Sequence, residues 1–322
     1  MTRVTECCGA IKQASKAEWR IDLSDGQGNE EGKQVNGQAS FAWYELLTTN
    51  AAAARAFYNH VVGWKSVDAS TAAFPYAVFS TGKTDVGGLM ELPPDALRMG
   101  ATPRWVGYVA VEDIDATAAQ LKRLGGSILV PPTDSNIGRV SIVADPQTAT
   151  FGLVGRLKRG TRSGAPSQPG DIGWQELFAA DAKRAFAFYS ELFGWQPGAR
   201  EDNPQDPYHL LSVDGHAFGG MFTKLPRVPA PFWLYYFEVA DIALAVERVK
   251  EGGGRVVQGP MELLRGIWVA RCIDPQGAMF SLQGETTRTD IEPASTRELD
   301  WAAEWGGFTS RGKVVAKPKP TR

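Results

Sequence analysis

The sequence has little cysteine, little net charge and no long apolar run. Its three cysteines (Cys7, Cys8 and Cys272) are too few for a disulfide framework or a cysteine-rich zinc site. The formal net charge of −2 gives no electrostatic reason to expect nucleic acid as a partner. No apolar run approaches the roughly 20 residues that a membrane span requires, and residues 1–40 lack the apolar segment of a secretory signal. We therefore expect a cytoplasmic protein with neither a nucleic-acid partner nor a membrane partner.

The sequence does contain an internal repeat. The stretch FAWYELLTTNAAAARAFYNHVVGWK begins at Phe41, and a similar stretch, IGWQELFAADAKRAFAFYSELFGWQ, begins at Ile172. Residues that are identical in both copies stand 131 positions apart, and they are Trp43 and Trp174, Glu45 and Glu176, Phe57 and Phe188, Tyr58 and Tyr189, Gly63 and Gly194, and Trp64 and Trp195. Later segments match at spacings between 128 and 132, which indicates short insertions and deletions in loops.

Each copy follows the order strand, helix, strand, hairpin, strand, helix, strand, strand. Asn50 has the side chain of a helix N-cap, and Gly63 stands where that first helix should stop. A second helix is predicted after Asp113, ending at a Gly-Gly pair. Strands that are separated by helices twice in each copy predict paired βαβββ modules, a mixed sheet and an α+β fold.

The composition also predicts how the chain is divided. The segment between the copies is rich in Gly, Pro and Ser, which is typical of a linker. The C-terminal stretch STRELDWAAEW carries a capping box and predicts a short amphipathic helix. We expect the copies to pack together, so that a monomer suffices although a dimer is possible. The predicted parts are a polar arm (1–40), copy one (41–155), a linker (156–171), copy two (172–284) and a tail (285–322).

Several motifs of both copies resemble the vicinal oxygen chelate superfamily. They are FYNHVVGW with FYSELFGW, VEDID with VADI, and the closing DPQ. That superfamily includes glyoxalase I, extradiol dioxygenases and bleomycin resistance proteins, and the chain looks most like tandem glyoxalase-like proteins of bacteria. The resemblance implies two tandem glyoxalase-like βαβββ-module repeats whose curved mixed sheets enclose a cleft for a small molecule. In members that bind a divalent ion, it also implies His, Gln or Glu ligands at set strand positions.

The positions that the resemblance assigns to metal ligands carry no ordinary ligand in this sequence. They fall on Trp43, Val106 and Gly152 in the first copy and on Trp174, Leu234 and Ser281 in the second. Only the serine could bind a metal, and weakly. The three histidines (His60, His209 and His216) come from different predicted elements and share no metal-binding spacing. We therefore predict no metal and no other cofactor, which makes metal-dependent glyoxalase or dioxygenase chemistry the third interpretation.

Strand alternation places the repeated residues on one face. Because side chains alternate along a strand, Trp43 and Glu45 share a face, as do Trp174 and Glu176. On the strand before the second helix, Tyr108 stands two residues after Val106, and Tyr236 stands two residues after Leu234. By the same alternation, we predict that both tyrosines line the cleft. Such an aromatic surface with few polar groups is typical of small-molecule sites.

Two roles remain open for these residues. The tryptophans are either core residues or ligand contacts, and each Glu either anchors its strand or serves the site. The favoured function is metal-free binding of a small, planar or aromatic ligand. The alternative is a lyase, isomerase or hydrolase that uses Glu45 or Glu176 as a general base and a nearby Tyr as the acid.

Overall fold

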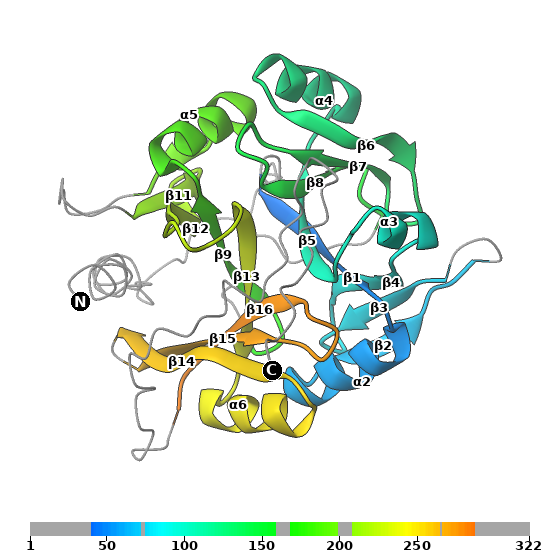
Figure 1. Ribbon diagram of the computed structural model, residues 1–322, viewed down its shortest axis with the longest axis vertical. Coiled ribbons are helices and arrows are strands. Elements are labelled where there is room, and N and C mark those ends of the chain that lie inside the picture. Colours follow the sequence, from blue (N-terminus) through cyan, green and yellow to red (C-terminus); the bar gives the residue numbers. More distant parts are fainter. Residues whose placement is uncertain (1–39, 72–74, 159–167, 199–207, 265, 287–322) are drawn as a thin grey trace, which may run out of the picture.

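The computed structural model describes residues 40–71, 75–158, 168–198, 208–264 and 266–286. Within these ranges the chain forms two eight-stranded sheets, one from each copy of the repeat (Figure 1). Most of the predicted N-terminal arm, with Cys7 and Cys8, and most of the tail, with its predicted helix, lie outside the described residues. None of the described helices is long and apolar enough to cross a membrane.

Repeat 1 forms the first sheet, with strand order β2-β3-β4-β1-β5-β8-β7-β6. Its elements are β1 (Phe41–Thr48), α2 (Ala51–Val61), β2 (Lys65–Asp68), β3 (Ala77–Ser80), β4 (Asp85–Glu91), α3 (Pro94–Arg98), β5 (Arg104–Ala110), α4 (Ile114–Arg123), β6 (Ser127–Asp134), β7 (Arg139–Ala144) and β8 (Thr150–Gly155). The pairs β1–β4 and β5–β8 are parallel, and the antiparallel pair β1–β5 joins two βαβββ modules at the centre of the sheet.

Repeat 2 builds the second sheet in the same order, β10-β11-β12-β9-β13-β16-β15-β14. Its elements are β9 (Ile172–Ala179), α5 (Ala182–Phe193), β10 (Gln196–Pro197), β11 (His209–Val213), β12 (His216–Thr223), β13 (Phe232–Val239), α6 (Ile242–Glu251), β14 (Arg255–Leu264), β15 (Ile267–Ile273) and β16 (Met279–Gly284). The parallel pairs are β12–β9 and β13–β16. The predicted α+β architecture of two tandem repeats with mixed sheets is confirmed, and each repeat contains two βαβββ modules.

The predicted capping residues begin the helices. The Asn50 side chain accepts a hydrogen bond from the Ala53 backbone N–H at 3.0 Å, and Asp181 does the same for Arg184. Such side-chain acceptors satisfy backbone donors that the first helical turn leaves unpaired. Beyond the ends of these two helices, Gly63 and Gly194 have φ angles of 84° and 73°, a left-handed conformation that glycine adopts without steric cost.

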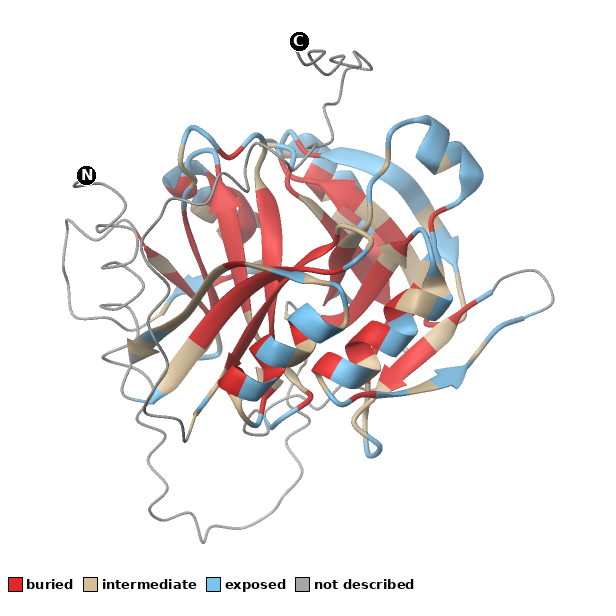
Figure 2. Ribbon diagram, turned by 60° about the horizontal axis from the view of Figure 1, so that its bottom comes forward, coloured by how far each residue is buried: buried red, intermediate tan, exposed pale blue. Residues whose placement is uncertain are grey.

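One apolar core joins the two repeats. Helices α2, α4, α5 and α6 bury their apolar sides in a single cluster, which includes Tyr58 of α2 and Tyr189 of α5. α2 lies beside α6, and α4 lies beside α5 (Figure 1). Figure 2 shows this layering, with buried strands inside and the exposed sides of the helices turned outward. We call this cluster the shared core, and we call the opposite face of each sheet its far face.

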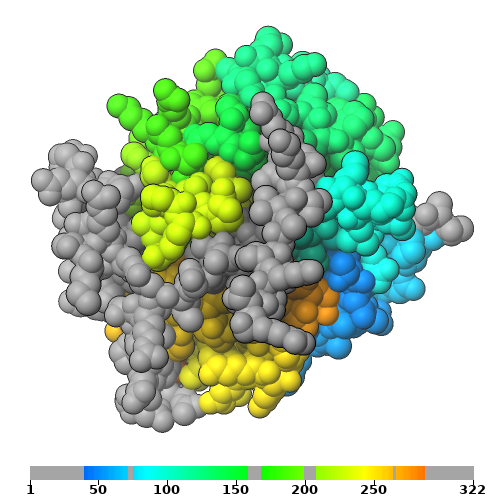
Figure 3. Space-filling model, viewed as in Figure 1, coloured from blue at the N-terminus to red at the C-terminus, as the bar shows by residue number. Residues whose placement is uncertain are grey.

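The shared core contains two reciprocal hydrogen bonds between the repeats. The Tyr58 hydroxyl donates to Asp274 Oδ2 at 3.1 Å, and the Tyr189 hydroxyl donates to Asp145 Oδ2 at 3.2 Å. These aspartates begin the repeated DPQ motifs, whose loops they also hold by accepting backbone N–H bonds. The repeats therefore form one unit with an internal pseudosymmetry. In the space-filling view, repeat 1 extends from blue to green, and repeat 2 from green to orange (Figure 3).

Candidate functional site

Each sheet carries its repeated Trp and Glu on the far face. Trp43 packs in the far-face cluster of repeat 1, whereas the next residue, Tyr44, belongs to the shared core. A register shift between Phe41 and Trp43 marks a bulge in β1, so Phe41 packs on the shared core as well. The alternation that places Trp43 and Glu45 on one face is therefore observed from Trp43 onward.

The far face of repeat 1 has a carboxylate at its centre. Tyr76 donates its hydroxyl proton to Glu45 Oε1 at 2.5 Å, and Tyr108 donates to Glu45 Oε2 at 2.5 Å. Trp43 Nε1 in turn donates to the Tyr76 hydroxyl at 3.2 Å. Glu45 is 6% exposed and Trp43 is completely buried. We call these four residues the Glu45 centre.

Burial controls the electrostatics of the Glu45 centre. Loss of solvent raises the pKa of Glu45, and hydrogen bonds from Tyr108, Tyr76 and Trp43 offset only part of that increase. Among the described residues, no basic side chain contributes to the shift. The pKa of Tyr108 is raised well above its ordinary value, first by burial and then by the charge of Glu45. Tyr108 therefore stays protonated and acts as a donor to the carboxylate.

Two glycines make room for the tyrosine rings. Gly152 on β8 pairs with Tyr108 on β5, and a side chain at 152 would overlap the Tyr108 ring. Gly88 on β4 pairs with Glu45, and a side chain there would overlap the Tyr76 ring. Both glycines therefore serve close packing inside strands, which allows an aromatic ring to lie against the sheet.

The far face of repeat 2 has an ion pair at its centre. Glu176 Oε2 accepts hydrogen bonds from the Tyr236 hydroxyl at 2.7 Å and from Arg271 Nη2 at 2.9 Å. Arg271 Nη1 donates to Gln258 Oε1 at 2.7 Å, and its guanidinium lies 4.9 Å from the centre of the Phe178 ring. The exposed fractions are 1% for Glu176 and 7% for Arg271. A buried ion pair with these added contacts compensates both charges inside the protein.

The aromatic residues of repeat 2 follow the pattern of repeat 1. Trp174 Nε1 donates to the Tyr208 hydroxyl at 3.1 Å, as Trp43 donates to Tyr76. Trp174 is only half-buried, whereas Tyr208 is buried and its pKa is raised, first by burial and then by the charge of Glu176. We call Trp174, Glu176, Tyr208, Tyr236 and Arg271 the Glu176 centre.

The structure brings the predicted site residues together in two sets. Trp43, Glu45 and Tyr108 meet in repeat 1, and the second set, which meets in repeat 2, consists of Trp174, Glu176 and Tyr236. The two sets belong to different buried clusters, so the repeats have separate centres on their far faces.

Sequence reasoning missed three members of these centres. Tyr76 and Tyr208 follow proline in matching segments, PYAVF and PYHLL, and that repetition was a usable signal. Arg271 has no counterpart in the other copy, because the equivalent position is Ile142. A comparison of the two copies for a charge present in only one of them would have found it.

The far-face residues do not fit the divalent ion that the family resemblance implies. Among the described residues, no three His, Cys, Asp or Glu side chains are grouped closely enough to hold a metal ion. Trp43, Val106 and Gly152, at the positions expected for ligands in repeat 1, offer no carboxylate, imidazole or thiolate. The Tyr108 ring fills the space beside Gly152, and both oxygens of Glu45 accept tyrosine hydroxyls.

Comparison with known proteins identifies the family. The model of the Glyoxalase/Bleomycin resistance protein/Dioxygenase superfamily matches residues 40–152 and again residues 171–282. The chain belongs to this superfamily and carries its domain twice.

Two relatives show the range of similar proteins. A Mycobacterium bovis protein named "Putative glyoxylase CFP32" is 30% identical over 244 residues, which cover 74% of this chain and 92% of the relative. The "Anthracycline biosynthesis protein DnrV" of Streptomyces peucetius is 34% identical over 142 residues, which cover 44% of this chain and 48% of the relative.

Solved structures share the fold at low sequence identity. The Mn(II)-bound glyoxalase from Novosphingobium aromaticivorans aligns with a TM-score of 0.54 at 15% identity, covering 80% of this chain and 83% of that protein. The dioxygenase LapB from Pseudomonas sp. KL28 aligns with a TM-score of 0.52 at 15% identity, covering 80% and 95%. At this identity the likeness shows the fold alone.

Proposed function

We propose that the protein binds a small, planar or aromatic molecule on the far face of repeat 1, with the Glu45 centre as its polar anchor and without a family-type metal ion. The observation that carries this proposal is a buried carboxylate that is surrounded by Trp43, Tyr76 and Tyr108 and has no cationic partner among the described residues. Small-molecule sites generally combine such an apolar, aromatic surface with a few convergent polar groups.

Half-buried apolar side chains surround the Glu45 centre and supply the remaining contact surface. They are Leu47, Ala69, Met90, Ala110, Val140, Ile142 and Leu157. A flat ligand that covered them would remove apolar area from water, at about 25 cal/mol for each Å². In repeat 2 the half-buried apolar residues around the far-face cluster are Trp174, Leu225, Met261 and Leu263. The more extensive partly exposed apolar surface favours repeat 1 as the binding repeat.

The name of one relative is consistent with a flat ligand. The Streptomyces peucetius relative is named for anthracycline biosynthesis, and anthracyclines contain a planar fused-ring system. Its similarity extends over less than half of this chain, so it supports the class of ligand and nothing finer.

Binding of planar dyes tests the proposed function. A panel of tricyclic aromatic probes should quench tryptophan fluorescence with one site per chain, and Met90→Asp should weaken every probe by placing a charge on the apolar surface. Leu244→Asp on the exposed surface of α6 is the matched control and should bind as the wild type does. The proposal is wrong if no planar probe binds, or if both variants bind as tightly as the wild type.

A metal-independent enzyme is the second candidate, because the Glu45 pKa is raised. A general base works best when its pKa lies near the operating pH, and burial moves Glu45 in that direction. Glu45 would accept a proton from the bound molecule, and Tyr108 or Tyr76 would donate one. In repeat 2 the corresponding base would be Glu176. Under this candidate, Glu45→Gln should lower turnover of a bound substrate about a hundredfold or more, with little change in its affinity. Unchanged turnover would exclude Glu45 as the base.

Metal-dependent glyoxalase or dioxygenase chemistry is the third candidate. The name of the mycobacterial relative, which calls it a glyoxylase, is the reason to consider this chemistry. The side chains described on either far face do not fit a divalent ion. Metal analysis of protein purified without chelators should find less than a tenth of an equivalent of zinc, iron, nickel or manganese. One equivalent, lost on chelation together with activity, would establish this candidate in place of the metal-free function.

A further inference from the structure

The two far faces carry matching rows of four residues, which differ in charge at one position. In repeat 1 the row across β1, β5, β8 and β7 consists of Trp43, Tyr108, Gly152 and Ile142. In repeat 2 the row across β9, β13, β16 and β15 consists of Trp174, Tyr236, Ser281 and Arg271. Ile142 therefore occupies the place from which Arg271 reaches the carboxylate of repeat 2.

Within the part of the chain that the structure describes, this difference leaves only one of the two carboxylates with a cation. Arg271 neutralises Glu176 at 2.9 Å, whereas both direct partners of Glu45 are neutral tyrosine hydroxyls. An ionised carboxylate that is buried without a cation is unfavourable, because water no longer solvates it. A bound cation would restore the balance that Arg271 supplies in repeat 2.

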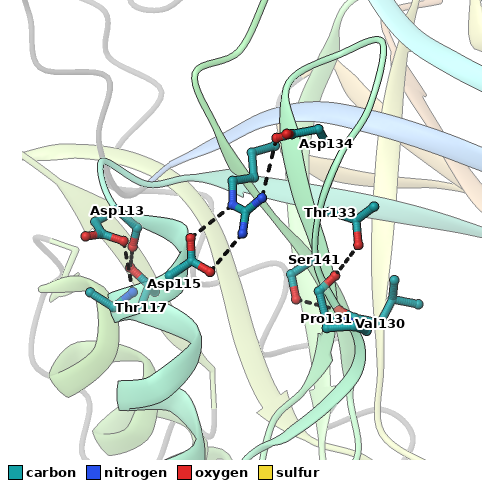
Figure 4. Close-up of polar contacts among 10 residues, drawn as sticks. Asp113, Asp115, Thr117, Val130, Pro131, Thr133, Asp134 and Ser141 are labelled. Carbon is teal, nitrogen blue, oxygen red and sulfur yellow. Dashed lines mark hydrogen bonds and ion pairs between the residues drawn. The ribbon is translucent and has the colours of Figure 1, made fainter.

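The basic side chains on neighbouring strands of repeat 1 are directed elsewhere. Arg139 on β7 holds Asp115 on α4 through two hydrogen bonds of 3.0 Å, and it also contacts Asp134 on β6 (Figure 4). Arg104 at the start of β5 donates from Nε to the Thr102 carbonyl. Neither of them contributes to the electrostatics of Glu45.

The Glu45 centre also has the groups that recognise a cation. Each carboxylate oxygen has two lone-pair directions, and one tyrosine hydroxyl donates to each oxygen of Glu45. Trp43, Tyr76 and Tyr108 place electron-rich ring systems around the carboxylate, and aromatic rings attract organic cations through their faces. Glu45 is 6% exposed, compared with 1% for Glu176, so the unpaired carboxylate is also the more accessible one.

We propose that the ligand of repeat 1 is a planar cation, namely an aromatic amine or a nitrogen heterocycle that is protonated at neutral pH. The charge of this ligand pairs with Glu45. In repeat 2 the protein itself supplies the equivalent charge, through Arg271. This inference rests on the proposed binding function and adds the charge class of the ligand. Repeat 2 needs no external cation, because Arg271 already holds Glu176.

A charge-matched set of probes tests the inference on the full-length protein. Proflavine is a tricyclic cation at neutral pH, anthracene methanol is a neutral tricycle, and anthracene carboxylate is an anionic one. Titration calorimetry should give one proflavine site per chain, with weaker binding of the neutral probe and the weakest binding of the anion. Glu45→Gln should weaken proflavine about tenfold or more, because it removes a charge-assisted contact, and it should change the affinity for anthracene methanol less than about threefold.

Two arginine substitutions provide the matched pair. Ile142→Arg installs the cation of repeat 2 and should weaken proflavine about tenfold or more, whereas Leu244→Arg, which adds the same charge on the exposed surface of α6, should change its affinity less than about threefold. The inference fails if the neutral or the anionic probe binds as tightly as proflavine, or if Glu45→Gln and Ile142→Arg leave proflavine unaffected. In those cases the proposed binding of planar molecules still stands. If none of the three probes binds to the wild type, the proposed function itself fails.

Discussion

Repeat 1 and repeat 2 share a fold and differ in the partners of their equivalent carboxylates, Glu45 and Glu176. Both place a Trp, a Glu and two tyrosines on the far face. Repeat 2 adds Arg271, which pairs with Glu176, while repeat 1 has Ile142 and surrounds Glu45 with neutral donors among the described residues. Both copies therefore keep the Trp, the Glu and the two tyrosines, and they differ in the positive charge of Arg271, which is present beside the carboxylate in repeat 2.

Exposed apolar residues show the same asymmetry. Among the described residues, six of the seven exposed large hydrophobics belong to repeat 1, namely Val67, Leu97, Met99, Ile128, Leu129 and Val130, and only Leu244 belongs to repeat 2. Val67 lies on β2 and the last three lie on β6, the two edge strands of the first sheet. Exposed apolar groupings of this kind mark interaction sites more often than isolated residues do. Repeat 1 thus differs from repeat 2 at its edges as well as at its centre.

The largest expected effect comes from separating the repeats. Residues 40–158 alone would expose the shared core, including Tyr58 and its lost partner Asp274, so we expect this fragment to aggregate or self-associate. Sedimentation of the fragment beside the full chain is the measurement. A stable, monomeric fragment would show that the repeats are independent domains, which would remove the basis for treating them as one unit.

Removal of the repeat 2 cation should have the next largest effect. Arg271→Ile copies the residue of repeat 1 into repeat 2 and leaves Glu176 buried without its ion pair, so we expect a loss of about 3–5 kcal/mol in the free energy of unfolding. Urea denaturation measures this quantity. Adding Glu176→Gln to the variant should recover much of the loss, because the orphaned charge disappears. A single variant as stable as the wild type would show that the ion pair is dispensable.

The aspartates of the shared core should make the two repeats respond alike to pH. Burial raises the pKa of Asp145 from its ordinary value of 3.8 to about 6, and burial also raises the pKa of Asp274. Because the folded protein then holds the proton more tightly than the unfolded chain, the contribution of these two aspartates to stability is greatest at low pH and is lost as pH rises through this window.

Asp145→Asn isolates that contribution. From about pH 4 to pH 7, the free energy of unfolding of the wild type should fall relative to the variant by up to about 3 kcal/mol, since each pKa unit corresponds to about 1.4 kcal/mol. Asp274→Asn should show a change of the same sign. A wild-type stability that rises relative to both variants over this window would contradict the assigned shifts.

The smallest effect is expected for Glu45→Gln. Glutamine keeps the size of the side chain and one carbonyl acceptor, and it removes a buried charge that has no cation, so stability at neutral pH should change by less than about 1 kcal/mol. Glu176→Gln is the matched variant, and it should destabilise more, by about 2 kcal/mol or more, because it strands Arg271. Equal losses in urea denaturation would mean that both carboxylates anchor their strands in the same way.

The fold and the rows of the far face could be predicted from sequence because both depend on local rules. The 131-residue repeat located the equivalent strands, capping residues such as Asn50 marked helix starts, and two-residue alternation placed Glu45 beside Trp43. The capping and alternation signals operate over a few neighbouring positions, so tertiary packing did not overturn them.

The partners of the carboxylates could not be predicted in the same way. Arg271 stands 95 residues from Glu176 in the chain, and no local pattern links the two. Tyr76 reaches Glu45 because its ring lies over Gly88, a packing detail that depends on the register of β3, β4 and β1. The choice between an anchored Glu and a Glu that serves a ligand depends on such contacts, and these contacts differ between the two copies.

Carboxyl NMR would test the central claim most directly. In protein labelled with ¹³C at glutamate carboxyl groups, Glu45→Gln identifies the resonance of Glu45. We predict that this resonance titrates above the ordinary value of 4.5 in the free protein and is the one that shifts most when proflavine binds. A Glu45 resonance that titrates at or below the ordinary value and does not move at saturating proflavine would contradict the account, because Glu45 would then be neither uncompensated nor at the site.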